Sequence, residues 1–135
     1  DVAQVADYVR QIEASDLLDR IGVDQAGIGA IVDAIVDEGV EHDRIVGIPQ
    51  GWRLNDSIKT TERKLAARAL KHRNQPLMAW CVGNAKCEPR GNAVTITKQA
   101  SGTAKIDPLM ALFDAAALMA MNPKPRKKLY QAIFV

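Results

Sequence analysis

A strand–helix–strand pattern near the start of the chain restricts the fold more than any other feature. Residues 19–24 and residues 44–50 are two short apolar runs, each long enough for one strand. Between them, isoleucines at helical spacing predict a helix over about residues 27–39, with Gly39 as a natural C-terminal cap. Two strands joined through a helix lie parallel, with a right-handed crossover. The pattern therefore predicts an α/β fold with a short parallel sheet flanked by helices.

The rest of the chain is predicted to be mostly helical. A basic helix capped by Asn55 or Asp56 is expected to reach about His72, with Leu65 and Ala69 facing inward. Residues 86–92 are rich in turn formers. The other predicted elements are an amphipathic helix over residues 2–14, an apolar helical turn over 77–82, an edge strand or hairpin arm over 93–97 and an apolar helix over about 107–121.

Length and composition exclude several classes of protein. At 135 residues the chain suits one globular domain, and it has no apolar run of the roughly 18–20 residues that a membrane span needs. Cys81 and Cys87 form no close CxxC pair and have no histidine cluster beside them. A zinc site is therefore not expected, and reduced thiols of a cytosolic protein are the simpler interpretation.

The charges are segregated along the chain. Residues 1–50 carry eleven acids against three arginines, whereas residues 51–135 carry fifteen lysines and arginines against five acids. Such segregation is typical of a chain whose basic half binds a polyanion while the acidic half supplies a site or another partner. The alternative, that the two charged faces neutralise each other within the fold, stays open at this point.

Asp24 is the first candidate site residue, because it follows a predicted strand and precedes small residues. In open parallel sheets, functional groups gather beyond the carboxyl ends of the strands. The alternative is that Asp24 only caps the next helix. A dinucleotide-binding turn is a poor alternative, since no third glycine follows Gly27 and Gly29 in register.

Asp107 is the second candidate, in the run Lys105-Ile-Asp107-Pro108 that opens the last helix. Helix capping is again the alternative, because an acid is electrostatically favoured at a helix start. Asp114 lies two helical turns further on, too far along the axis to share one metal with Asp107, and is expected to be a surface or salt-bridge acid. The acids between the two strands are expected to form a solvated face: Asp33, Asp37, Glu38, Glu41 and Asp43.

Taken together, these segments resemble the distal half of phage terminase large subunits of the long-tailed type. That family tends to show a His before Asn-Pro, then Trp, then Asn, a Lys-rich connector, and Lys-Ile-Asp opening an Ala/Leu-rich helix. The matching residues here are His72, Asn74, Pro76, Trp80, Asn84, Lys98 and Lys105-Ile-Asp107. One departure is Gln75, which separates Asn74 from Pro76. The resemblance covers about residues 2–122.

The resemblance implies a partial ribonuclease H-like fold and a metal-dependent DNA endonuclease of phage packaging. Three acids would hold two Mg²⁺ or Mn²⁺ ions, with Asp24 as the second acid and Asp107 as the third. The first acid and the first strands would precede residue 1, so the chain alone would be nearly inactive. Residues 1–122 would be the distal portion of the nuclease domain and residues 123–135 a basic and apolar tail.

The basic residues are expected to bind DNA phosphates without reading sequence. Lys105 could contact the scissile phosphate, whereas Trp52 and Trp80 are expected to anchor the core or loops rather than to stack on bases. The expected DNA-binding residues are Lys59, Arg63, Lys64, Arg68, Lys71, Arg73, Lys98 and Lys105. A solvated face is the alternative for the basic helix.

The resemblance also implies partners: double-stranded viral DNA, the terminase small subunit and the portal protein, in the cytoplasm of a bacterial host. A homodimer is expected through pairing of the Asp24 strand or exchange of the tail. Two alternatives to the nuclease are a non-catalytic DNA- or portal-docking module and another ribonuclease H-like polynucleotidyl transferase.

Overall fold

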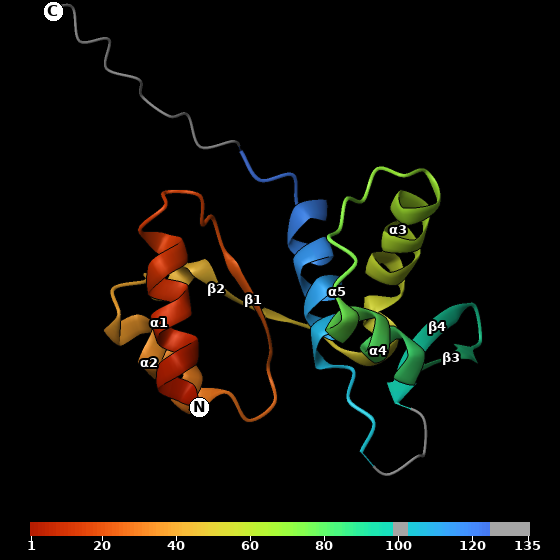
Figure 1. Ribbon diagram of the computed structural model, residues 1–135, viewed down its shortest axis with the longest axis horizontal. Coiled ribbons are helices and arrows are strands. Elements are labelled where there is room, and N and C mark those ends of the chain that lie inside the picture. The colour runs from red at the N-terminus through yellow and green to blue at the C-terminus, as the bar shows by residue number, and fades with distance from the viewer. Residues whose placement is uncertain (99–102, 125–135) are drawn as a thin grey trace, which may run out of the picture.

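The computed structural model describes residues 1–98 and 103–124 (Figure 1). Residues 125–135 of the C-terminal tail, including its apolar end at residues 129–135, lie outside the described residues. The helices are α1 (Val2–Glu13), α2 (Gly29–Asp37), α3 (Asn55–Ala66), α4 (Pro76–Asn84) and α5 (Asp107–Ala120), with short 3-10 turns η1 (His42–Arg44) and η2 (Gly51–Leu54). The strands are β1 (Ile21–Asp24), β2 (Ile45–Ile48), β3 (Ala85–Arg90) and β4 (Ala93–Lys98).

The predicted strand–helix–strand unit is confirmed. β1 and β2 pair in parallel, in a register that sets Asp24 opposite Ile48 at the carboxyl edge. α2 connects the two strands and buries Ile35, and Gly39 follows it with a φ of +96°, a left-handed conformation that glycine adopts without strain. The α/β class with a short parallel sheet is therefore established.

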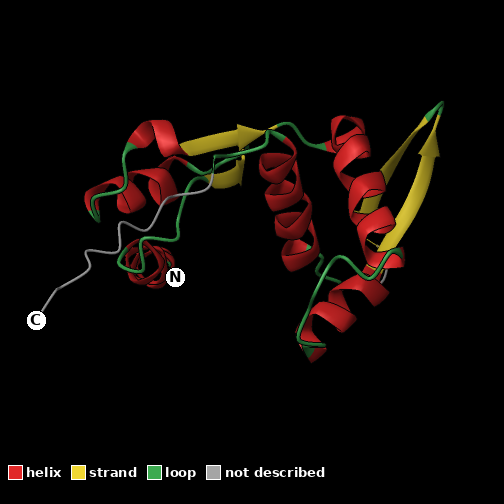
Figure 2. Cartoon of the chain, turned by 90° about the horizontal axis from the view of Figure 1, so that it is seen from above, coloured by secondary structure: helices red, strands yellow, loops and turns green. Residues whose placement is uncertain are grey.

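α5 is the central element of the molecule. In both views it lies between the β1–β2 side of the molecule and the side formed by α3, α4 and the β3–β4 hairpin (Figures 1 and 2). It packs closely on β1, since a Cβ added to Gly22 would lie 3.2 Å from Leu118 and 3.4 Å from Asp114. The close approach of helix and strand means that any side chain at position 22 would crowd these neighbours.

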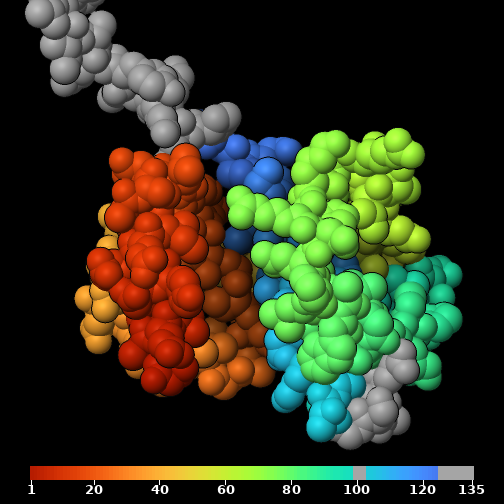
Figure 3. Space-filling model, in the orientation of Figure 1, coloured from red at the N-terminus to blue at the C-terminus, as the bar shows by residue number. Residues whose placement is uncertain are grey.

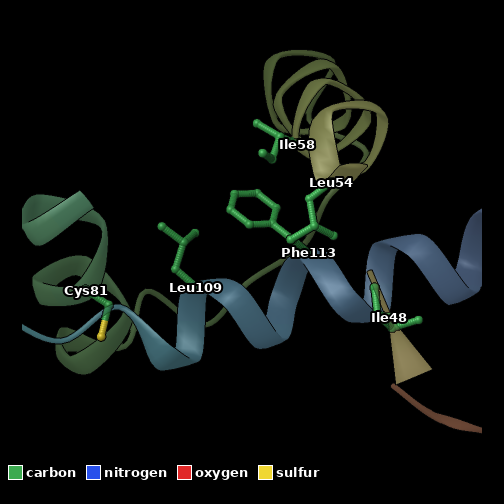
Figure 4. Close-up of a cluster of buried hydrophobic side chains, with 6 residues drawn as sticks. All are labelled: Ile48, Leu54, Ile58, Cys81, Leu109 and Phe113. Atoms are coloured by element: carbon green, nitrogen blue, oxygen red, sulfur yellow. The ribbon is translucent and has the colours of Figure 1, made fainter. Parts of the chain in front are cut away.

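The main core lies between α5 and its neighbours (Figure 4). Phe113 points from α5 toward Leu54 of η2 and Ile58 of α3. The buried cluster comprises Ile48, Leu54, Ile58, Cys81, Leu109 and Phe113. Burial of this many apolar side chains fixes α5 against the end of β2, and α5 thereby carries Asp114 to the carboxyl edge of the parallel strands.

The basic helix is shorter than predicted. α3 ends at Ala66 rather than near His72, and Leu65 and Ala69 are exposed rather than inward-facing. The amides of Arg68 and Ala69 donate to the carbonyls of Leu65 and Lys64, and Arg68 has a φ of +55°. This is a Schellman termination, which usually has glycine at the left-handed position. Because Arg68 rather than glycine occupies the left-handed position, the end of α3 cannot be recognised from the sequence.

The start of α3 and the hairpin also differ from expectation. Leu54, not Asn55 or Asp56, is the N-terminal cap; instead the Asn55 side chain accepts a hydrogen bond from the Val94 amide of β4. The predicted strand over residues 93–97 is confirmed as β4. Its partner β3 occupies residues that were predicted to be a turn, since the turn is confined to Gly91 and Asn92.

Arg44 fixes the amino-terminal half. Its guanidinium donates to both carboxylate oxygens of Glu13 at 2.6 and 2.7 Å and to the backbone carbonyls of Leu18 and Asp19. These bonds raise the pKa of Arg44, with the Glu13 hydrogen bond as the largest cause. One side chain thus holds the end of α1, the approach to β1 and the start of β2 together.

α1 forms one side of the molecule in the space-filling view, with part of α5 visible between it and the α3–α4 side (Figure 3). Of the apolar residues at helical spacing on α1, Ala6 is buried while Val5 and Ile12 are exposed. None of the helices among residues 1–98 and 103–124 is long and apolar enough to cross a membrane.

Candidate active site

Asp24 lies at the carboxyl edge of β1 and is exposed to solvent. Its Oδ1 accepts a hydrogen bond of 3.1 Å from the backbone N–H of Ala26. This turn orients the carboxylate locally and does not cap a helix, because the cap residue of α2 is Ile28 and makes no side-chain cap bond. The capping alternative for Asp24 is therefore wrong.

Asp114 is the acid that the structure brings to this edge, and the expectation of a surface acid is wrong. Asp114 is only 6% exposed, and its Oδ1 accepts a 2.9 Å hydrogen bond from Gln50 Nε2. Burial raises the pKa of the Asp114 carboxyl; the Gln50 hydrogen bond lowers it, and the negative charge of Asp24 raises it further. The two carboxylates thus interact across the edge of the sheet.

Gln50 is a functional candidate that sequence reasoning missed. Its amide nitrogen donates to the carbonyl of Ile48 as well as to Asp114, so it joins the end of β2 to the middle of α5. In the sequence, a polar residue two positions beyond a predicted strand is only weak evidence for a functional residue. Its hydrogen-bond partner, Asp114, is 64 positions away, so only the tertiary structure shows the contact.

Asp107 occupies the first turn of α5 and is exposed, as is Lys105 just before it. The cap residue of α5 is Ile106, without a side-chain cap bond, so Asp107 is not the cap residue either. The backbone carbonyl of Lys105 accepts a hydrogen bond from Asn84 Nδ2, which ties this segment to the end of α4. Asp107 lies about 10 Å from Asp114 along the helix axis.

The donor set at this edge consists of carboxylate and amide oxygens, the ligands that Mg²⁺ and Mn²⁺ prefer. Asp24 ends β1, and Asp114 of α5 is hydrogen-bonded to Gln50 just beyond the end of β2, whereas Asp107 lies two helical turns from Asp114. Within residues 1–98 and 103–124, no three His, Cys, Asp or Glu side chains converge as a metal-binding group. The chemistry of the donors fits a divalent cation; the sharing of one cation by Asp24 and Asp107 stays a prediction.

Gln25, which follows Asp24, lies across the backbone of β2. A Cβ added to Gly47 would lie 2.4 Å from Gln25 Nε2 and 2.7 Å from its Cγ. Such distances are far inside van der Waals contact, so the present position of the Gln25 side chain requires a glycine at 47. Gln25, next to Asp24 in the chain, thus occupies the space left by the missing side chain at Gly47.

All eight predicted DNA-binding residues are exposed, but they belong to different segments. Only Lys59, Arg63 and Lys64 lie on α3, because the helix ends before the others; Lys98 closes β4. Arg68, Lys71 and Arg73 follow α3 in the connection to α4. On α3 itself, Asp56 and Glu62 line the same shallow depression as Lys59 and Arg63, so this face is of mixed charge.

Neither tryptophan is buried in the core, so of the two expected roles, anchor of the core or of a loop, the first is wrong. Trp52 is 55% exposed in η2, and Trp80 is 47% exposed on α4. The guanidinium carbon of Arg53 lies 5.4 Å from the centre of the Trp52 ring, within the range of a cation–π contact. Cys81 is buried and Cys87 exposed, and both thiols are free, as predicted.

Comparison with known proteins gives one match. A family model described as terminase large subunit, endonuclease domain, matches residues 1–122. No curated protein and no solved structure matches the chain. The family match spans every described helix and strand, including the edge that carries Asp24, Gln50 and Asp114.

Proposed function

Since this chain belongs to the terminase large subunit endonuclease domain family, we propose that it hydrolyses DNA phosphodiester bonds with divalent cations at the carboxyl edge of β1 and β2. The observation that carries the proposal is the position of Asp24. It is an exposed carboxylate at the edge of a parallel pair, it caps no helix, and Asp114 is hydrogen-bonded to Gln50 just beyond the end of the neighbouring strand.

Asp24 and Asp107 are the carboxylates proposed to hold Mg²⁺ or Mn²⁺, with two ions in the complete site. Divalent cations there would activate a water and stabilise the leaving oxygen of the phosphodiester. Lys105, two residues before Asp107, is proposed to contact the scissile phosphate, since an ammonium group offsets the charge of a phosphate oxygen.

The chain's basic side chains are proposed to bind the DNA backbone. Neutralisation of phosphates supplies most non-specific DNA affinity and carries no sequence information. This suits an enzyme that cuts viral DNA at many sequences. The proposed contacts are Lys59, Arg63, Lys64, Arg68, Lys71, Arg73, Lys98 and Lys105, all of them exposed.

The proposed setting is DNA packaging in the cytoplasm of a bacterial host. The partners would be double-stranded viral DNA, the terminase small subunit and the portal protein. These follow from membership of the family rather than from any single contact.

A non-catalytic docking module for DNA or the portal is the second candidate. One observation favours it: no three potential ligand side chains converge within the described part of the chain. If the domain is such a module, replacing Asp24 or Asp107 should not affect DNA cleavage by the whole terminase. The cleavage experiment described next therefore separates the two candidates.

The test is made in a terminase large subunit that carries this domain. Asp107→Asn and Asp24→Asn are each expected to lower cleavage more than a thousandfold in Mg²⁺ and in Mn²⁺, while DNA affinity changes by less than about threefold. Asp37→Asn is the matched control, because Asp37 is an exposed acid at the end of α2. Undiminished cleavage by Asp107→Asn in Mn²⁺ would remove Asp107 from the site.

A further inference from the structure

We propose that Trp52, with Arg53 over one face of its ring, is a stacking platform for an unpaired nucleobase of the DNA strand at the candidate active site. The inference rests on the proposed DNA-cleaving function and adds to it a residue that contacts a base. Phosphate contacts alone position the DNA backbone and make no contact with the bases.

The position of Trp52 follows from the register of the parallel strands. Asp24 pairs with Ile48, and η2 begins three residues after Ile48. Gly51, with a φ of +68°, turns the chain at this point. Trp52 therefore lies in the segment that leaves β2 at the edge of the sheet where Asp24 ends β1.

Both ends of this turn are anchored, although its middle is exposed. Gln50 is held by hydrogen bonds to Ile48 and Asp114, and Leu54 is 2% exposed in the core. Trp52, between them, leaves more than half of its surface in solvent. A large apolar ring on a firmly held turn loses little conformational freedom on binding, which favours recognition of a flat ligand.

The chemistry of the pair fits a nucleotide. An indole stacks on the face of any base, without preference for sequence, and this suits a nuclease with little sequence selectivity. Arg53 covers one face of the ring and brings a positive charge for a neighbouring phosphate. The bases of an intact duplex are stacked on one another, so the platform should take an unpaired base.

The test uses the fact that the chain has two tryptophans, both half exposed. Trp80→Phe leaves Trp52 as the only indole, and Trp52→Phe leaves Trp80. On titration with a single-stranded oligonucleotide at moderate salt, the emission of Trp52 is expected to fall by at least half and that of Trp80 by less than a tenth. A blunt duplex of the same sequence is expected to quench Trp52 much less.

Affinity for the single strand gives an independent readout. Trp52→Leu is expected to weaken binding at least fivefold, because leucine is apolar but has no π face, whereas Trp52→Tyr stays within threefold of the parent. Trp80→Leu is the matched control and should leave the affinity unchanged. Circular dichroism checks that each variant folds.

Two results would overturn the inference, and they differ in what else they reject. If the single strand binds with a steep salt dependence while Trp52 emission and the Trp52→Leu affinity do not change, the platform is rejected and the proposed DNA-binding function stands. If neither single-stranded nor duplex DNA binds to the parent chain at low salt, the proposed function is rejected together with the platform.

Discussion

Gln50 and Asp114 are 64 positions apart in the chain and are joined by a 2.9 Å hydrogen bond from Gln50 Nε2 to Asp114 Oδ1. The bond connects the end of β2 to α5 at the edge where Asp24 is exposed. A carboxylate that is 6% exposed beside another carboxylate is an unfavourable choice for a purely structural position. Burial of this carboxylate therefore costs stability. The proposed cation-binding edge would account for a negative charge kept near Asp24.

Replacement of Asp114 should therefore stabilise the fold at neutral pH. Burial raises the pKa of Asp114, so the folded state favours the protonated form. As the pH rises from the ordinary value of 3.8 through the folded pKa, the unfolded chain ionises first and stability is lost. Asp114→Asn keeps an acceptor for Gln50 but carries no charge. Its melting temperature at pH 7 should exceed that of the parent, and the gain should shrink as the pH falls toward 4.

The control for this prediction is Asp33→Asn, an exposed acid of α2, which should leave the melting temperature unchanged. Gln50→Glu would set a second carboxylate against Asp114 and should destabilise the fold. The double variant Gln50→Glu with Asp114→Asn restores a donor–acceptor pair in the opposite sense and should recover the loss. Equal melting curves for parent and Asp114→Asn at pH 7 would contradict the account.

Gly47→Ala should disturb the site through Gln25. The new methyl group would lie 2.4 Å from Gln25 Nε2, so the Gln25 side chain must leave its place beside Asp24. Because that side chain is flexible and on the surface, the free energy of unfolding should fall by only about 1 kcal/mol. Urea denaturation measures this loss, and Gln25→Ala in the same chain should remove most of it. An unchanged loss in the double variant would show that another contact is responsible.

The sequence predicted the parallel strands, their helix and the position of Asp24 at a strand end because these depend on local patterns. Periodicity marks a helix, and an acid after a short apolar run marks a strand end. The same reasoning could not place Asp114. The spacing of Asp114 from Asp107 along one helix showed that the two cannot share a metal ion. It could not show whether Asp114 is buried, because that depends on packing of α5 against Gly22 and Gln50. Burial of this kind is decided by contacts between distant segments.

Two further errors have different physical causes. The end of α3 was missed because Arg68 takes the left-handed position that glycine usually marks. Trp52 was expected to anchor the core or a loop rather than to stack on bases. In the structure Leu54, two residues later, takes the core position and leaves the indole outside. Departures from the common pattern are themselves informative where, as at Trp52, they occur beside a candidate site.

DNA binding should depend steeply on salt and little on sequence, because it is proposed to rest on phosphate neutralisation. Reversal of Arg63, Lys64 and Arg68 to Glu should weaken duplex binding by more than tenfold at moderate salt. Fluorescence anisotropy with a labelled duplex measures this. The matched control reverses the acids of α3, with Asp56 and Glu62 changed to Lys, and should strengthen binding. Unchanged affinity in the triple variant would mean that this face is only solvated.

Arg68 allows stability and DNA binding to be separated at one position. An L-residue at a φ of +55° is strained by about 1–2 kcal/mol, and glycine avoids that strain but loses more chain entropy on folding. Arg68→Gly should therefore raise the free energy of unfolding by about 0.5–1 kcal/mol, measured by urea denaturation. The same variant removes one of the proposed phosphate contacts, so its duplex affinity should fall about as far as that of Arg68→Ala, which keeps the strain. If Arg68→Gly is instead less stable than Arg68→Ala, the left-handed termination of α3 is not the conformation that the chain adopts in solution.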